Sequence, residues 1–166
     1  MFGSGKGADV VTALNRGASG IDGLIATGCG FSAGLKKPLT LLIGDLSAIH
    51  DLNSFKILAE SKMPVFLVII NNHGGGIFSF LPISRKEKMF EMYFGTPHKL
   101  EFRAISEMFG LEYHKPESIK AFEETFLTSI QKKKSVVFEV ITKREMNPKQ
   151  FDDFRKKLMK CDFRPK

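Results

Sequence analysis

Three runs of consecutive aliphatic and aromatic residues stand out along the chain. They are residues 39–43, 65–70 and 136–141. Unbroken apolar runs of this length are typical of parallel strands covered on both faces, whereas a strand with one face in water alternates. We therefore expect three buried parallel strands, with a shorter fourth strand at residues 111–114.

Helix-length segments lie between and after these runs, with apolar residues at three- and four-residue steps. They are residues 47–61, 102–109, 118–131 and a last helix that begins at Asn147-Pro148. Strands that alternate with helices favour right-handed crossovers and a parallel sheet. The fold class is therefore expected to be α/β, a three-layer α/β/α sandwich with a mainly parallel sheet. Residues 85–100 are expected to form a long functional loop.

Composition narrows the class of protein. The chain has 166 residues, of which 43% are hydrophobic and 26% charged, which is ordinary globular usage. Disordered, collagen-like and disulfide-stapled proteins are thereby excluded. The two cysteines, Cys29 and Cys161, form no CxxC pair, and such scarcity suits a reducing cytoplasm. The sequence contains no apolar run near the roughly 20 residues that a membrane helix needs, so we expect a cytoplasmic protein.

The net charge of +7 does not predict a nucleic-acid partner. Basic clusters occur late in the chain, at residues 132–134, 143–144 and 155–157. They alternate with acidic residues, and no aromatic stacking motif accompanies them. Solvated helix faces are the preferred interpretation.

Polar residues follow two of the expected strands. Gly44-Asp45 closes the first strand, and Asn71-Asn72 closes the second. Ligands of open parallel sheets bind outside the carboxyl ends of the strands. A carboxylate, an amide oxygen and a carbonyl from the following glycine turn would give a Mg²⁺ ion three oxygen ligands. Alone, Asp45 could equally cap a helix and Asn72 could form a turn.

This spacing resembles the thiamine diphosphate signature, although Leu46 stands where glycine is usual. Four segments further resemble the 2-succinyl-5-enolpyruvyl-6-hydroxy-3-cyclohexene-1-carboxylate synthases of menaquinone biosynthesis. They are NRGASGIDG at 15–23, GDLSAIHDLN at 44–53, NNHGGGIFSFLP at 71–82 and FGTPH at 94–98. That family condenses isochorismate with 2-oxoglutarate and releases CO₂. The resemblance covers residues 15 to about 141.

The resemblance implies a role for each site residue. Mg²⁺ or Mn²⁺ would be held by the Asp45 and Asn72 side chains and the Gly74 carbonyl. The diphosphate and the rest of the cofactor would contact Gly44, Leu46, Ser47, Ser19, Gly20 and Ile21, of which Ile21 would be the wedge that bends the cofactor. A substrate carboxylate would meet Arg16, since a guanidinium pairs with a carboxylate through two hydrogen bonds. The pocket near the reacting carbon would be walled by Ile77, Phe78 and Leu81.

The resemblance also implies a partner. Residues 15–166 correspond to the C-terminal, diphosphate-binding domain, and residues 1–14 are set apart as an N-terminal segment. The pyrimidine-binding domain, in the same enzyme or on a separate chain, would have to complete the site, and the full-length enzyme is expected to be a homo-oligomer. Three alternatives stay open: a non-catalytic interaction module, a generic nucleotide- or anion-binding module, and another thiamine diphosphate-dependent 2-oxo acid decarboxylase or carboligase.

Overall fold

The computed structural model describes residues 11–15 and 20–160. Four strands form one sheet in the order β1-β2-β4-β3, and every pair is parallel. The strands are β1 (Leu39–Gly44), β2 (Val65–Asn71), β3 (Glu112–His114) and β4 (Val136–Ile141). All four agree with the sequence prediction to within one residue at either end.

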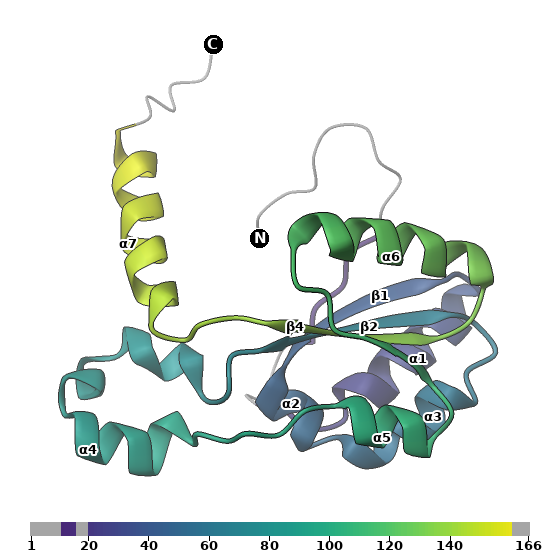
Figure 1. The fold of residues 1–166 in the computed structure, drawn as a ribbon, viewed down its shortest axis with the longest axis horizontal. Helices are drawn as coiled ribbons and strands as arrows, with labels where there is room; N and C mark the ends of the chain where they lie inside the picture. Colours follow the sequence, from purple (N-terminus) through teal and green to yellow (C-terminus); the bar gives the residue numbers. More distant parts are fainter. Residues whose placement is uncertain (1–10, 16–19, 161–166) are drawn as a thin grey trace.

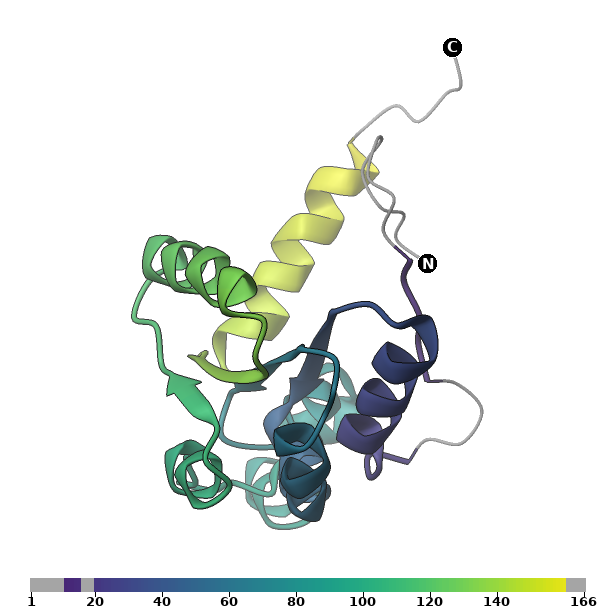
Figure 2. The same cartoon turned by 90° about the vertical axis from the view of Figure 1, so that its right-hand side faces the viewer.

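Helices cover both faces of the sheet, so the predicted α/β/α sandwich is confirmed (Figures 1 and 2). On one side lie α1 (Leu24–Leu35), α2 (Asp45–Ile49), α3 (Phe55–Ala59) and α5 (Arg103–Met108). The other side carries α6 (Ile119–Lys132), whose Phe122 and Phe126 pack on Phe66 and Phe138. Coverage is uneven, because Leu42 on the edge strand β1 remains 65% exposed.

A separate lobe lies between β2 and α5, at the lower left of Figure 1. It consists of η2 (Gly76–Phe80), η3 (Pro82–Arg85), α4 (Glu87–Phe90) and the π-helical turn η4 (Glu91–Gly95). The loop expected at residues 85–100 is therefore helical in its first part. The last helix, α7 (Met146–Met159), projects from the end of β4 and touches the lobe where Phe151 meets Phe80. No helix in the described ranges is long and apolar enough to cross a membrane.

Helix α1 has no counterpart in the sequence prediction. Its glycines hide the apolar periodicity, yet Ile25, Gly28, Cys29 and Ser32 are buried at helical spacing. A Cβ atom at Gly28 would lie 2.9 Å from Leu41 Cδ2, so glycine allows the helix to approach β1 closely.

The prediction of a single helix over residues 47–61 is wrong, because the helix is interrupted at Asp51. The 3₁₀ turn η1 (Leu52–Ser54) separates α2 from α3. Asp51 is 3% exposed and accepts hydrogen bonds from Ile25 N at 2.7 Å and Ser54 Oγ at 2.5 Å. Its side chain thus accepts a hydrogen bond from a backbone N–H in the first turn of α1, a group that has no partner within that helix. This tertiary contact overrides the helical pattern of apolar residues in 47–61.

Candidate cofactor site

The site lies at the carboxyl ends of β1 and β2. Asp45 follows the last residue of β1, and Asn72 follows the last residue of β2. Gly44 pairs with Ile70 in the sheet register, so the two strand ends are neighbours. The apolar runs end at Ile43 and Ile70, and the polar residues that follow them lie at the same edge of the sheet because the two strands are parallel.

The Asp45 carboxylate accepts hydrogen bonds from both strand ends. Oδ1 accepts from Leu46 N at 2.8 Å, while Oδ2 accepts from Asn72 N at 3.2 Å and from Gly74 N at 3.0 Å. The residue is only 3% exposed. Asp45, Asn72 and Gly74 are therefore brought together, as expected from the sequence, and the backbone itself fixes the carboxylate.

The Leu46 backbone amide donates to the Asp45 carboxylate at 2.8 Å, and its contact with a diphosphate stays a prediction. Its N–H points at Asp45 within the first turn of α2. Ser47, in the same turn, is half-buried, whereas Gly44 before it is exposed. The hydroxyl of Ser47 stays a predicted diphosphate contact.

His98 is a member of the site that sequence reasoning missed. Its Nε2 atom lies 3.2 Å from Asp45 Oδ2, and its Nδ1 atom accepts a hydrogen bond from Leu100 N at 3.2 Å. Because Nδ1 is an acceptor, the proton of a neutral ring is on Nε2, which donates to Asp45. The four histidines are scattered along the sequence without metal-like spacing, and only the FGTPH segment of the resemblance pointed here.

Asn72 carries an unusual buried acceptor. Its Oδ1 atom is buried and has no hydrogen-bond partner. Buried polar atoms without a partner are rare and call for an explanation, such as an ion. An amide oxygen is a suitable ligand for a hard cation, so the residues present fit a divalent metal.

The remaining oxygen of the expected metal set is the Gly74 carbonyl. It accepts from Gly76 N at 2.9 Å and retains a second lone pair. Among the described residues, no three histidine, cysteine, aspartate or glutamate side chains cluster as metal ligands. A metal here would therefore have one carboxylate and neutral oxygens, a set that Mg²⁺ and Mn²⁺ complete with phosphate and water.

The glycine turn after Asn72 packs closely against the backbone at Gly95. Gly74 has φ 150°, and a Cβ atom on it would lie 2.3 Å from the Gly95 carbonyl oxygen. Gly75 N donates to the same carbonyl at 2.7 Å. Glycine is therefore required at Gly74 by both its backbone conformation and this close approach.

Arg144 holds the lobe on the site. Its Nη2 atom donates to both carboxylate oxygens of Glu91 at 2.7 Å, and Nη1 donates to Gly95 O at 3.1 Å. Only 13% of the arginine side chain is exposed. The planar guanidinium thus joins the Glu91 carboxylate and the Gly95 carbonyl at once, through charged hydrogen bonds that connect the lobe to the chain after β4.

The apolar residues assigned to the substrate pocket lie at the surface of the lobe. Ile77 is 75% exposed, Leu81 46% and Phe78 38%, although the Phe78 ring also packs against Phe94. They are thus not ordinary core residues. Ile21 and Gly20 are exposed before α1, while Arg16 and Ser19 lie outside the described residues.

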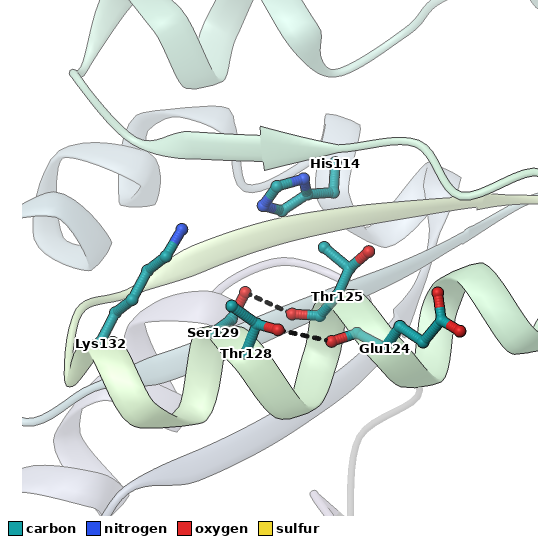
Figure 3. Close-up of a pocket in the computed structure, with 6 residues that line it drawn as sticks. All are labelled: His114, Glu124, Thr125, Thr128, Ser129 and Lys132. Atoms are coloured by element: carbon teal, nitrogen blue, oxygen red, sulfur yellow. Dashed lines mark hydrogen bonds between the residues drawn. The ribbon is translucent and has the colours of Figure 1, made fainter.

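A different pocket, of about 250 Å³, opens between β3 and α6 (Figure 3). Its walls include His114 from β3 and Lys132 from the last turn of α6. Since β3 pairs with residues 136–138 of β4, this pocket lies beside the amino-terminal half of that strand. It is therefore separate from the strand ends that carry Asp45 and Asn72.

The chain belongs to the thiamine pyrophosphate enzymes. The family model described as "Thiamine pyrophosphate enzyme, C-terminal TPP binding domain" matches residues 8–140, a range that contains Asp45, Asn72, Gly74 and His98. The match begins before residue 15, so the domain boundary placed there stays a prediction.

The chain is similar, more particularly, to enzymes named 2-succinyl-5-enolpyruvyl-6-hydroxy-3-cyclohexene-1-carboxylate synthase. It is 43% identical to the one from Prosthecochloris aestuarii over 89% of this chain and 26% of that protein. It is 46% identical to the enzyme from Chlorobium phaeobacteroides, over 86% of this chain and 24% of that protein. It is also 46% identical to the enzyme from Rubrobacter xylanophilus, over 88% of this chain and 25% of that protein. The resemblance drawn from the motifs is confirmed, and the chain spans about a quarter of the length of these relatives.

Proposed function

We propose that this chain binds thiamine diphosphate with Mg²⁺ or Mn²⁺ and forms the cofactor-binding part of a synthase that condenses isochorismate with 2-oxoglutarate, with loss of CO₂. The observation that carries the proposal is the convergence of Asp45, Asn72 and Gly74, with the buried Asn72 Oδ1 atom lacking a partner. The family and the names of the relatives support the same cofactor and reaction.

In this proposal, Asp45, Asn72 and the Gly74 carbonyl hold the metal, and the Ser47 hydroxyl binds the diphosphate. Bound thiamine diphosphate supplies the carbon nucleophile for the oxo acid. The chain's own residues bind and orient the reactants, as Arg16 does by pairing with a substrate carboxylate. Ile21, Ile77, Phe78 and Leu81 shape the apolar walls and exclude water near the reacting groups.

The exposed apolar side chains support a partner over the site. Ile77, Phe78 and Leu81 present apolar area to solvent, a few residues after the proposed metal ligand Gly74. In the proposal, the pyrimidine-binding domain covers them, on the same polypeptide or on a separate chain, and the complete enzyme is a homo-oligomer. A cytoplasmic location stays a prediction from the composition.

Calorimetric titration tests the cofactor. Thiamine diphosphate and ATP are each titrated into the chain with and without Mg²⁺. We expect heat only for thiamine diphosphate with Mg²⁺. Preference for ATP would favour the generic nucleotide-binding module, and no binding in the presence of the pyrimidine-binding domain would favour the interaction module.

Release of CO₂ tests the reaction. The chain, Mg²⁺ and thiamine diphosphate are incubated with 2-oxoglutarate, with and without the pyrimidine-binding domain of a relative added in trans. We expect turnover only with that domain, because the chain alone leaves the cofactor half exposed. Turnover of pyruvate in preference to 2-oxoglutarate would instead support another 2-oxo acid decarboxylase or carboligase.

A further inference from the structure

Glu139 is a fully buried carboxylate in the middle of the sheet. It lies on β4, between β2 and β3, and is 0% exposed. Its Oε1 atom accepts from Asn71 Nδ2 at 2.6 Å, and its Oε2 atom accepts from Phe102 N at 2.9 Å and Tyr113 Oη at 2.5 Å. A buried carboxylate is costly unless it is hydrogen-bonded, and an apolar residue would serve packing alone.

Asn71, the last residue of β2, links Glu139 to the carboxyl end of that strand. It too is 0% exposed, and its amide nitrogen also donates to Leu100 O at 3.0 Å. Its Oδ1 atom accepts from His73 N at 3.0 Å, which supports the left-handed backbone of His73 at φ 61°. The amide cannot flip, because each end already faces a group of the opposite kind.

Residues 98–102 are therefore held in place by several hydrogen bonds. Leu100 O is held by Asn71, and Phe102 N is held by Glu139. The backbone N–H of His98 donates to His73 O at 3.3 Å, and the Leu100 N–H donates to the His98 ring. With its Nδ1 atom engaged in this way, the ring presents Nε2 to Asp45.

We propose that Glu139 is a positioning residue of the cofactor site: through Asn71 and Phe102 it fixes residues 98–102, so that His98 meets the Asp45 carboxylate in one orientation and one tautomer. The role toward a metal rests on the proposed function, since Asp45 is its expected ligand. The positioning of His98 does not depend on that function and can be measured without cofactor.

The unmodified chain provides the first test. Two-dimensional NMR of the histidine ring nitrogens is recorded at a pH where imidazole is neutral, with His98 assigned from the His98→Gln variant. It should show one tautomer of the His98 ring, with the proton on Nε2. The backbone amides of Phe102 and His73, which donate to Glu139 and Asn71, should exchange slowly with solvent although neither lies inside a helix or strand. A mixture of tautomers, or fast exchange of both amides, would overturn the proposal.

A matched pair of variants provides the second test. Glu139→Gln keeps the shape but places an amide nitrogen against a donor, either Asn71 Nδ2 or the Phe102 and Tyr113 donors. Tyr113→Phe removes one hydrogen bond to the same carboxylate but leaves the Asn71 and Phe102 contacts. We expect Glu139→Gln to mix the His98 tautomers, whereas Tyr113→Phe leaves the ring spectrum unchanged. If both folded variants and the parent give identical ring spectra, Glu139 does not position His98 and the proposal is wrong.

Metal affinity links the result to the proposed function. In Glu139→Gln, the affinity for Mg²⁺ with thiamine diphosphate should fall by about tenfold or more, as it does when groups that orient metal ligands are changed. Tyr113→Phe should bind like the parent. If the parent itself binds no thiamine diphosphate, the proposed function fails while the ring spectra still decide the positioning. If Glu139→Gln binds as tightly as the parent, the link to the metal is wrong.

Discussion

The Nε2 atom of His98 lies 3.2 Å from the Oδ2 atom of Asp45, although 53 residues separate the two in the sequence. Among the residues that the structure describes, Oδ2 thus receives three donors, from His98, Asn72 and Gly74, whereas Oδ1 receives only the Leu46 amide. The two oxygens of one carboxylate therefore have different roles. Oδ1 retains a lone pair that the proposed metal ion would use, and Oδ2 holds the backbone in place.

Asp45→Asn should weaken Mg²⁺-dependent binding of thiamine diphosphate by more than about tenfold, because the charge of the proposed metal ligand is lost. It should also lower the free energy of unfolding by about 1–3 kcal/mol, since an amide nitrogen would face the Leu46 N–H or the Asn72 and Gly74 N–H groups. Titration calorimetry and urea unfolding measure the two effects. Asp152→Asn, on the exposed side of α7, is the control, and equal affinity in Asp45→Asn would remove Asp45 as a ligand.

Gly74→Ala should destabilise the protein by about 2 kcal/mol or more, because alanine tolerates neither φ 150° nor the contact with Gly95 O. Gly30→Ala provides the matched control, since its added Cβ in α1 meets no atom within 4 Å. That change should stabilise the protein by up to about 1 kcal/mol through helix propensity. Thermal unfolding of both variants decides the matter, and equal shifts would contradict a strained turn at Gly74.

Arg144→Lys should loosen the lobe while leaving the sheet intact. Lysine cannot reproduce the fork to Glu91 together with the bond to Gly95 O. Losing one charged hydrogen bond worth about 1.5 kcal/mol would make proteolytic cleavage within residues 76–95 roughly tenfold faster. Mass spectrometry of the first cleavage products gives the measurement. Arg155→Lys on the exposed side of α7 should digest like the parent, and an unchanged rate for Arg144→Lys would show that the fork does not hold the lobe.

Glu112 should make the free energy of unfolding decrease at acidic pH. The hydrogen bond from Lys132 is the largest cause that lowers the pKa of Glu112 from its ordinary value of 4.5, against an opposing effect of burial. Because the folded pKa is the lower one, the stabilisation is present above pH 4.5 and is lost as the pH falls through the folded pKa. Melting temperatures from pH 7 to pH 3 should therefore fall more steeply for the parent than for Glu112→Gln. Parallel curves would contradict the effect.

The sheet was predictable from the sequence because its strands are short, apolar and bounded by polar residues. Helix α1 was not, since glycines at positions such as Gly28 are selected by close packing on Leu41 and lower the apparent helix propensity. The break at Asp51 was missed for a related reason. Its partner Ile25 lies 26 residues away, and no local pattern reports such a contact.

The core of the candidate site was predictable as a set of residues but not as a geometry. Asp45 and Asn72 follow neighbouring strands, so their proximity follows from the parallel sheet. The tautomer of His98 and the separate roles of the two Asp45 oxygens depend on hydrogen bonds between distant segments. Glu139 looks like a surface position by residue type, yet it is fully buried.

The long sequence separations within the site have a consequence for synthesis of the protein. Asn71 meets Glu139 across 68 residues, and Asp45 meets Gly74 across 29. Contacts between distant segments form only after the intervening chain has been closed into a loop. On the ribosome, the hydrogen bonds from Asn71 and Phe102 to Glu139 therefore form only after β4 has emerged. A ligand that needs the complete arrangement would then bind after the chain has folded, and it would stabilise the folded state by mass action.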